Sequence, residues 1–264
     1  MKTSLLVSTY NRPSALKLCL QSILAQTQLP DEILVADDGS GAATRSVVVA
    51  IQQISQVPII HVWHEDDGFR LAAIRNKALL KASGDYVIQI DGDMLLHRHF
   101  VRDHVRFARN GYWIKGNRVM LPEKLTHAIE HEGAALPGNL LFRSDVGKRK
   151  LLLPVEFLNP FLTYRMPYKG VQGGNMGYWK ADAVRVNGFD EAFEGWGKED
   201  DDFVQRLMRA GVRPAQLVFA ARTYHLYHPD ADRSKVAINT RLLEKRNAAG
   251  VIEAGKGLRE IELD

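Results

Sequence analysis

The sequence predicts an α/β fold built on a mostly parallel sheet. Three observations predict it: short apolar runs near the N-terminus, amphipathic segments between them, and strand starts that recur about every 27 residues. The runs are nearly continuous in Val, Ile and Leu, which is typical of parallel strands covered on both faces. The predicted strands are Ser4–Thr9, Glu32–Ala36, Pro58–Trp63 and Asp85–Ile90.

Helices are predicted in the three gaps between these strands. Pro13 suits a first helical turn, because the N–H that proline lacks has no partner there. Apolar residues then recur on one helical face, namely Leu16, Cys19, Leu20, Ile23 and Leu24. The other two helices are Thr44–Ile54 and Leu71–Ala82, and Ser83-Gly84 ends the second.

Composition sets limits on the class of protein. Of 264 residues, 45% are hydrophobic and 25% charged, with one cysteine, which excludes a collagen, a disordered tail and a disulfide scaffold. The net charge of +4 is weak evidence for nucleic acid and suits an anionic ligand or membrane surface equally. No run approaches the roughly 18 apolar residues of a membrane span. We expect a cytoplasmic protein, at most peripherally attached to the inner face of the membrane.

Polar residues follow every predicted strand, at the edge where parallel sheets bind ligands. They are Ser8–Asn11, Asp37–Ser40, His64–Asp67 and Asp91–Asp93. Turn propensity explains one acidic cluster easily and three poorly, because converging carboxylates repel unless a positive charge lies between them. A divalent cation, Arg70 or Arg75, or both, could supply that charge.

Glycine-based nucleotide motifs are absent. The turn Ser8–Pro13 contains no glycine, so the dinucleotide fingerprint is missing, and the chain has no G-x-x-x-x-G-K-[ST] segment. Asp91 and Asp93 instead offer oxygen ligands, which suit a hard ion such as Mn²⁺ or Mg²⁺ bridging phosphate oxygens.

A denser motif lies between Gly173 and Phe203. Its loop Gly195–Lys198 precedes four acids, Glu199–Asp202, which open a helix predicted to end near Ala210. One or two acids would satisfy the helix dipole, so four indicate a further role. A carboxylate there could accept a proton from an attacking hydroxyl, and Trp196 would offer a flat face to a sugar ring.

Histidines follow the next predicted strand, Val218–Ala221. His225 and His228 stand three residues apart beside tyrosines, so a metal-ligand role and a structural role are both open. The other histidines show no comparable grouping and are interpreted as surface or core residues: His61, His64, His97, His99, His104, His127 and His131.

Together these motifs resemble the family 2 glycosyltransferases, inverting enzymes of the GT-A fold. The matching segments are Val7–Pro13, Asp37–Ser40, Arg75-Asn76, Asp91–Asp93 and Gly195–Phe203. The last is also similar to the acceptor motif of β-1,4-galactosyltransferases and chondroitin-type polymerases. The resemblance implies transfer of a hexose or N-acetylhexosamine from a UDP-sugar to a hydroxyl of a glycan or glycolipid acceptor, in bacterial surface polysaccharide or lipopolysaccharide synthesis.

The resemblance also implies a role for each site residue. The nucleotide-binding residues would be Ser8, Thr9, Tyr10, Arg12, Asp38, Arg70, Asn76, Asp91 and Asp93. Asp93 would bind Mn²⁺ or Mg²⁺ together with His225, with His228 as the reserve candidate. Asp200 would be the general base. The acceptor would contact Gly174, Asn175, Trp196, Glu199 and Asp201.

The motif order predicts a single GT-A unit over residues 1–264. Its nucleotide-sugar half is expected at about 1–115, its acceptor and catalytic half at about 116–230, and a helical tail at 231–264. The stretch Val119–Tyr168 matches no motif and is expected to be an acceptor-side loop region that orders on binding. The sequence does not predict the oligomeric state.

Three arginines at helical spacing, Arg102, Arg106 and Arg109, lie on a predicted helix Phe100–Arg109. They make an anionic membrane or lipopolysaccharide a candidate partner, although an ordinary solvated face is the simpler interpretation. Nucleic acid is not an expected partner.

Two other classes of protein remain as alternatives. A sugar nucleotidyltransferase normally carries a glycine-rich basic loop after its first strand, and Ser8–Pro13 argues against it. A non-catalytic carbohydrate-binding module would have no reason to keep Asp93 together with Asp200, and a UDP-release assay separates the two.

Overall fold

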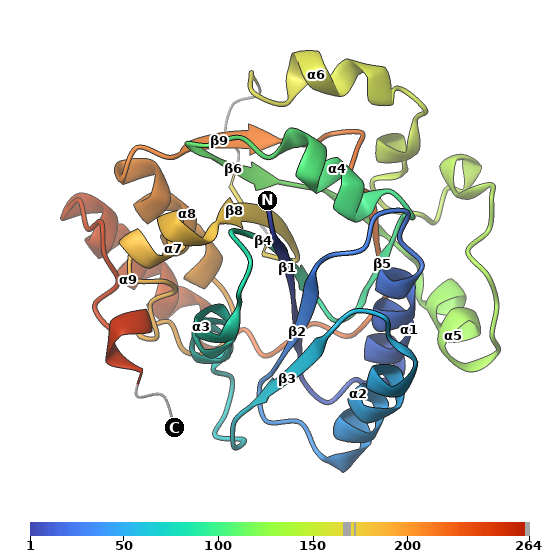
Figure 1. Ribbon diagram of the computed structural model, residues 1–264, viewed down its shortest axis with the longest axis horizontal. Coiled ribbons are helices and arrows are strands. Elements are labelled where there is room, and N and C mark those ends of the chain that lie inside the picture. Colours follow the sequence, from blue (N-terminus) through green and yellow to red (C-terminus); the bar gives the residue numbers. More distant parts are fainter. Residues whose placement is uncertain (166–169, 172, 262–264) are drawn as a thin grey trace.

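The computed structural model describes residues 1–165, 170–171 and 173–261. The four predicted N-terminal strands are present and pair in parallel in the order β3-β2-β1-β4 (Figure 1). Their bounds are β1 Thr3–Thr9, β2 Glu32–Asp37, β3 Ile59–Trp63 and β4 Tyr86–Asp91. The predicted helices lie between them as α1 Pro13–Leu24, α2 Ala42–Ile54 and α3 Leu71–Lys81.

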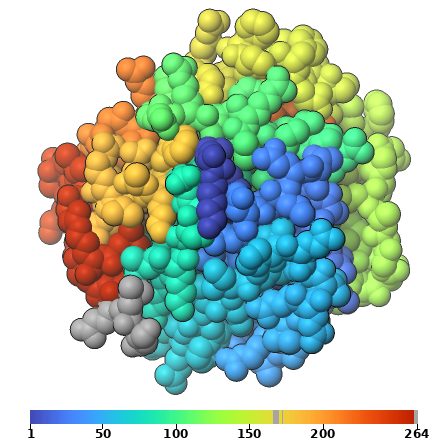
Figure 2. Space-filling view, in the orientation of Figure 1, coloured from blue at the N-terminus to red at the C-terminus, as the bar shows by residue number. Residues whose placement is uncertain are grey.

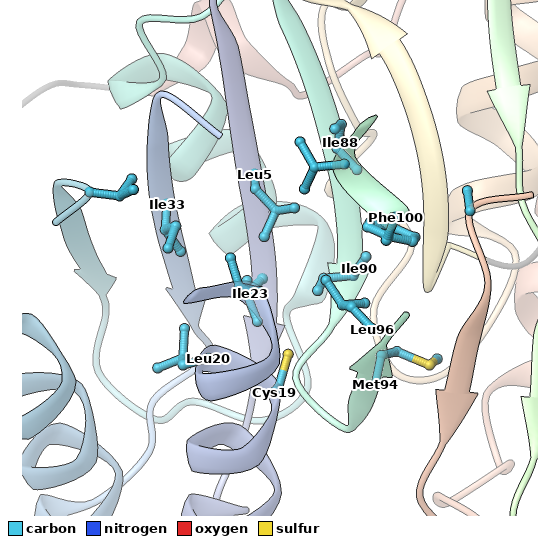
Figure 3. Packing of buried hydrophobic residues seen from close by; sticks show 14 of the residues in the cluster. Leu5, Cys19, Leu20, Ile23, Ile33, Ile88, Ile90, Met94, Leu96 and Phe100 are labelled. Atoms are coloured by element: carbon cyan, nitrogen blue, oxygen red, sulfur yellow. The ribbon is translucent and has the colours of Figure 1, made fainter. Parts of the chain in front are cut away.

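Both faces of this parallel sheet are buried, which accounts for its unbroken apolar runs. Leu5 and Val7 of β1 belong to the core under α1 and α2, whereas Leu6 belongs to the core that α3 and α8 cover. Figure 3 shows strand residues of the first core, Leu5, Ile33 and Ile88, facing the helix α1. Alternate residues therefore serve different cores, and both faces are mostly apolar.

The sheet continues beyond β4 with strands from the second half of the chain. β8 (Asn175–Trp179) pairs antiparallel with β4 and with β6 (Tyr112–Lys115), and β9 (Arg213–Gln216) pairs parallel with β6. A separate three-stranded sheet has the order β5-β10-β7. Its bounds are β5 Met94–Leu96, β10 Thr223–His225 and β7 Arg118–Met120. In this small sheet β5 begins immediately after Asp93 and β10 ends at His225. Because His225 pairs with Met94, the sheet brings two predicted metal ligands together.

The prediction of a strand at Val218–Ala221 is wrong. These residues form bends, and the strand is β10, two residues further on. The backbone N–H of Phe219 donates to Asn159 Oδ1 (3.1 Å), and that of Ala221 donates to Asp103 Oδ2 (3.0 Å), so side chains replace a strand partner. The segment is apolar because it is at least partly buried, and in sequence such an irregular buried segment looks like a strand.

Further helices surround the two sheets (Figure 1). They are α4 Phe100–Phe107, α5 Glu123–His131, α6 Asn159–Leu162, α7 Lys180–Arg185, α8 Glu199–Arg209 and α9 Val236–Ala248. Short 3-10 turns are η1 Leu140–Phe142, η2 Arg149–Leu152, η3 Glu156–Leu158 and η4 Leu258–Glu260. The expected helical tail is therefore α9. Among the described residues, no helix has the length and apolar character needed to cross a bilayer.

The stretch Val119–Tyr168 is more regular than the loop that the sequence predicts. It contains the end of β7, α5, α6 and three 3-10 turns, and Figure 2 shows its yellow and light green surface beside α4. Met166–Tyr168 lie outside the described residues. Local apolar contacts, such as Leu125 and Ile129 of α5 against Val119, hold this region to the small sheet.

Candidate active site

A cavity of about 690 Å³ opens where β1 and β4 end, within the size range of small-molecule sites. Its position agrees with the rule that parallel sheets bind ligands beyond their carboxyl ends. The predicted site residues that line it are Ser8, Thr9, Tyr10, Arg12, Asp38, Asp91, Asp93, Trp196, Glu199, Asp200, Asp201, His225 and His228. The fold therefore gathers segments from β1, β4, α8 and β10 around one space.

Arg70 and Asn76 do not line this cavity. The backbone N–H of Arg70 donates to Asp38 Oδ2 (2.9 Å), while its guanidinium pairs with Asp67 in a smaller neighbouring pocket. Asn76 is fully buried, and its amide both donates to and accepts from the backbone of Phe189 (2.8 Å each). Both residues therefore support the site from outside this cavity, and their expected contact with the nucleotide stays a prediction.

Gly174 and Asn175 also lie outside the cavity lining. A Cβ on Gly174 would lie 2.4 Å from Asp91 Oδ2, so glycine makes room for that carboxylate. The buried Asn175 donates to the carbonyls of Asn117 and Ala221 (3.0 Å each) and thus joins β8 to the small sheet. These two residues shape the site, and their expected contact with the acceptor stays a prediction.

Only two of the three acidic strand ends reach the cavity. Glu65–Asp67, after β3, line the smaller pocket instead. Asp38 Oδ1 lies 2.7 Å from His64 Nε2, and Asp37 Oδ2 lies 2.8 Å from His61 Nε2. These two histidines, which the sequence analysis interpreted as surface or core residues, therefore orient the carboxylates at the end of β2.

A buried arginine solves the repulsion between the remaining acids. Arg75 of α3 is 1% exposed, and its Nη1 donates to Asp200 Oδ1 (2.9 Å) and Glu199 Oε1 (3.4 Å). Its Nη2 donates to Asp91 Oδ1 (3.3 Å) and its Nε to Ser8 Oγ (3.1 Å). We call Arg75, Asp91, Glu199 and Asp200 the arginine centre. One of the two arginines considered from the sequence thus supplies the expected positive charge.

The two adjacent acids of the arginine centre, Glu199 and Asp200, both have raised pKa values. Burial, with Asp200 beside it, raises the pKa of Glu199 to about 8. Burial also raises the pKa of Asp200, against the opposing effect of Arg75 and of a hydrogen bond from the Gly173 backbone. A Cβ on Gly173 would lie 2.1 Å from Asp200 Oδ2, which explains the glycine. Both carboxyl groups therefore bind a proton more readily than exposed acids do, and Arg75 opposes this effect at each of them.

A second group of ligand-type side chains consists of Asp93, His225 and His228, whose ligand atoms lie within 4.8 Å of one another. Asp93 Oδ2 is 3.6 Å from His225 Nε2 and 3.3 Å from His228 Nε2. Asp93 Oδ1 and His225 Nδ1 are buried without a hydrogen-bond partner among the residues that the structure describes. We call these three residues the histidine centre.

The histidine centre has the chemistry of a divalent-cation site. Burial, with Arg118 nearby, lowers the pKa of His225 to about 3, so its imidazole is neutral and free to act as a ligand. His228 Nδ1 lies 2.6 Å from the Pro229 carbonyl, which favours a proton on Nδ1 and leaves Nε2 as the ligand atom. Orphaned buried atoms and a mixed oxygen–nitrogen donor set fit a metal such as Mn²⁺.

Arg12 occupies the rim of the histidine centre. Its Nη1 donates to Asp93 Oδ2 (3.1 Å) and its Nη2 to Glu130 Oε1 of α5 (3.2 Å). Arg118 of β7 also lines the cavity, with Nη1 4.0 Å from Asp91 Oδ2. Sequence reasoning missed Glu130, which lies in the stretch without a recognisable motif, and Arg118, which immediately precedes that stretch.

The opposite wall of the cavity carries the predicted sugar-stacking residue. Trp196 is 41% exposed, and the guanidinium of Arg233 lies 5.1 Å from its ring centroid. Asn239 of α9 donates to the carbonyls of Glu194 (3.0 Å) and Gly197 (2.9 Å), so α9 holds the loop before α8. The C-terminal helix, to which the sequence assigned no role, therefore supports the acceptor wall.

Charged groups of α9 also hold the body of α8. Arg246 pairs with Asp202 (2.9 Å) and Asp190 (2.6 Å), and Arg206 pairs with Asp202 (2.7 Å). All four groups are mostly or fully buried. This network orients the first turn of α8, which carries Asp200.

Two family models match this chain. The model "Glycosyl transferase family 2" matches residues 4–165, and the model "N-terminal domain of galactosyltransferase" matches residues 155–229. The first model thus extends through most of the stretch in which the sequence showed no motif.

Curated relatives include the chondroitin synthase of Escherichia coli, 26% identical over 245 residues, or 86% of this chain and 35% of that protein. The validoxylamine A glucosyltransferase of Streptomyces hygroscopicus subsp. limoneus is 28% identical over 223 residues, or 79% of this chain and 48% of that protein. Human β-1,4-galactosyltransferase 2 is 33% identical over 98 residues, or 34% of this chain and 26% of that protein. The chain spans between 23% and 35% of the chondroitin and hyaluronan synthases it matches.

Solved structures share the fold. S. aureus TarS 1–349 in complex with UDP aligns with a TM-score of 0.65 at 18% identity, covering 98% of this chain and 68% of that one. The mannosyltransferase PcManGT from Pyrobaculum calidifontis, in complex with GDP-Man and Mn²⁺, gives 0.61 at 18% identity, covering 97% and 65%. The predicted GT-A fold is confirmed. Because the family model covers more than half of its residues, the chain belongs to glycosyl transferase family 2.

Proposed function

We propose that this protein transfers a hexose or N-acetylhexosamine from a UDP-sugar to a hydroxyl group of a glycan acceptor, with inversion at the anomeric carbon. The observation that carries the proposal is the placement of Asp200. Its carboxylate lies in the cavity, is held by Arg75 and the Gly173 backbone, and shares that cavity with the histidine centre. One cavity thus offers both a base and a cation site.

The donor would bind at the ends of β1, β2 and β4. Ser8, Thr9, Tyr10 and Asp38 would hold the nucleoside, and Asp91 would face its ribose or diphosphate. The UDP complex of the structural neighbour TarS supports a uridine nucleotide. The GDP-Man complex of the neighbour PcManGT makes GDP-sugars the appropriate comparison.

Asp93, His225 and His228 would hold a divalent cation near the diphosphate. When bound, the cation would neutralise the charge of the departing nucleoside diphosphate. Mn²⁺ suits imidazole nitrogen better than Mg²⁺, which prefers oxygen ligands and retains water. We therefore propose Mn²⁺, with Mg²⁺ as the alternative ion.

Asp200 would act as the general base. Its carboxylate accepts the proton of the acceptor hydroxyl as that oxygen forms a bond to the anomeric carbon. The bond from that carbon to the diphosphate oxygen breaks on the opposite side, and UDP leaves with the electron pair. Trp196, Glu199 and Asp201 would position the acceptor sugar, so no covalent bond to the enzyme is required.

The shared sheet supports one catalytic unit over residues 1–264. Strands before and after residue 115 pair in the seven-stranded sheet, and the helix of the 231–264 tail holds the acceptor wall. We propose that neither half binds both substrates alone.

Substitution of Asp200 by Asn tests the proposal. The shape is kept and the base is removed, so transfer should fall by about 10²- to 10⁴-fold. Binding of UDP with Mn²⁺, measured by calorimetry, should remain close to that of the parent protein. Asp182→Asn, in the first turn of α7, is the matched control and should leave transfer unchanged.

Transfer is measured as release of UDP or GDP from panels of UDP- and GDP-sugars, with and without an oligosaccharide acceptor. Full activity of the Asp200→Asn variant would rule out this residue as the base. Binding of UDP-sugars without any release would instead indicate a binding module.

A further inference from the structure

Exposed apolar side chains gather on the segment Leu153–Phe161. Phe157 is 68% exposed, Phe161 is 62% exposed and Leu153 is 38% exposed, and Pro154 and Pro160 lie beside them at the surface. Phe157 and Phe161 stand four residues apart on the consecutive turns η3 and α6, which puts them on one side. We call these five residues the apolar ridge. Other large exposed apolar residues include Phe142 of η1 (84% exposed), Val49 and Ile54 of α2, and Ile238 of α9.

The ridge is anchored to the protein beneath it. The buried Asn159 accepts the backbone N–H of Phe219 (3.1 Å) and donates to the Glu156 carbonyl (3.0 Å). The Thr163 hydroxyl donates to the Asn159 carbonyl (2.7 Å), and Tyr164 Oη donates to the Phe107 carbonyl (2.7 Å). The two phenylalanines are therefore held outward by a fixed support, and their exposure is part of the fold.

Positive charge adjoins the ridge. Tyr164 brings α6 to the end of α4, where the Arg109 guanidinium lies 5.4 Å from the Tyr164 ring (Figure 1). Arg102 and Arg106 are also exposed on α4. The basic face that the sequence predicts thus lies next to an apolar ridge that the sequence did not reveal.

Negative charge is scarce on the same segment. Glu156 is its one acid between Arg149 and Arg165, and Arg222 neutralises it at 2.8 Å. On α4, Asp103 is mostly buried and paired with Arg102. The surface around the ridge is therefore cationic, with its carboxylates already paired.

We propose that the apolar ridge and the α4 arginines form one surface that docks onto an anionic phospholipid bilayer. Phenylalanine and leucine enter the boundary between headgroups and acyl chains, and arginine side chains bind lipid phosphates while their stems stay in apolar surroundings. Neither feature alone gives stable attachment, but apolar burial and electrostatic attraction add. Charge complementarity identifies the partner as an anionic bilayer. This inference does not depend on the proposed transfer reaction.

The ridge is tested by co-sedimentation with phosphatidylcholine vesicles that contain or lack phosphatidylglycerol. The protein should bind the anionic vesicles, and Phe157→Ser with Phe161→Ser should weaken that binding about tenfold or more. The matched control is Ile54→Ser with Ile238→Ser, which removes two equally exposed apolar residues elsewhere and should change nothing. Thermal melting of each variant checks that it is folded.

The arginines are tested in the same assay. Each of Arg102→Gln and Arg106→Gln should weaken binding about fivefold, because a basic residue near an anionic surface contributes about 1 kcal/mol. Added salt should reduce the effect. Arg185→Gln with Arg241→Gln, on α7 and α9, is the control pair and should bind as the parent protein does.

Three outcomes would overturn the proposal. The first is no binding of the parent protein to anionic vesicles at low salt. The second is unchanged binding by the double serine variant, which would mean adsorption by charge alone. The third is concentration-dependent self-association without lipid that the serine substitutions remove, which would make the ridge an interface between copies of this chain.

Discussion

The arginine centre and the histidine centre stabilise converging carboxylates in different ways. In the first, Arg75 is 1% exposed and contacts three carboxylates from inside the protein. In the second, Arg12 is 30% exposed and reaches Asp93 from the rim, while Asp93 Oδ1 has no hydrogen-bond partner within the described part of the chain. A buried cation makes a permanent charge balance, whereas a rim cation leaves a place for an exchangeable ion. Similar acidic motifs therefore lead to one fixed structural charge and one candidate metal site.

If the two centres differ in this way, substitution of Arg75 should lower the free energy of unfolding far more than substitution of Arg12. Arg75→Gln should lower the free energy of unfolding by about 3–5 kcal/mol, because the buried Glu199 and the partly buried Asp200 and Asp91 lose their counter-charge. Sugar transfer should disappear as well, since Asp200 loses its support. Arg12→Gln, the control, should cost about 1 kcal/mol or less. Urea unfolding and UDP-release assays measure both; equal destabilisation would contradict the distinction.

Metal affinity should depend on the histidine centre alone. His225→Ala should weaken Mn²⁺ binding at least about tenfold, because one ligand is lost. The same experiment on His228→Ala shows which histidine contributes more. The control is His127→Ala, whose side chain is 64% exposed on α5. Calorimetry or the Mn²⁺ paramagnetic signal gives the affinity, and an unchanged value in both variants would exclude this site.

Substitution of Asn239 tests whether the two centres are separate, because the arginine centre depends on the distant helix α9 and the histidine centre does not. Asn239→Ala frees the carbonyls of Glu194 and Gly197, so kcat should fall about tenfold while Mn²⁺ affinity stays constant. Arg241→Ala, exposed on the same helix, is the control. A loss of Mn²⁺ affinity equal to the loss of kcat would show that the centres are not separate.

The smallest effect concerns pH. Burial, with Asp91 nearby, raises the pKa of Asp93 from 3.8 to about 6. The metal-free folded state therefore binds a proton that the unfolded state has released, so the stability contributed by Asp93 falls as pH rises from about 4 to about 6. Asp93→Asn should remove this part of the pH dependence in thermal melts. Mn²⁺ affinity should rise over the same interval, and a flat profile would contradict the assignment.

Much of the N-terminal half could be predicted, because its signals are local. The apolar runs around Leu5 and Ile33 and the proline at position 13 each specify the conformation of their own segment. The structural roles of Asn76 and Asn175 could not be predicted, for the opposite reason. A buried amide that holds backbone and an amide that holds a ligand look the same in sequence, and only hydrogen-bond partners distinguish them.

The sequence by itself determined the parallel strand–helix repeat, the acids at the ends of β2 and β4, and the acidic start of α8, because periodicity and turn chemistry act over a few residues. The tertiary structure decided how these charges are balanced. Arg75 meets Glu199 across 124 residues of chain, and Arg12 meets Glu130 across 118. Such pairs form only when the sheet brings distant segments together, and burial then determines which charge is fixed and which can exchange.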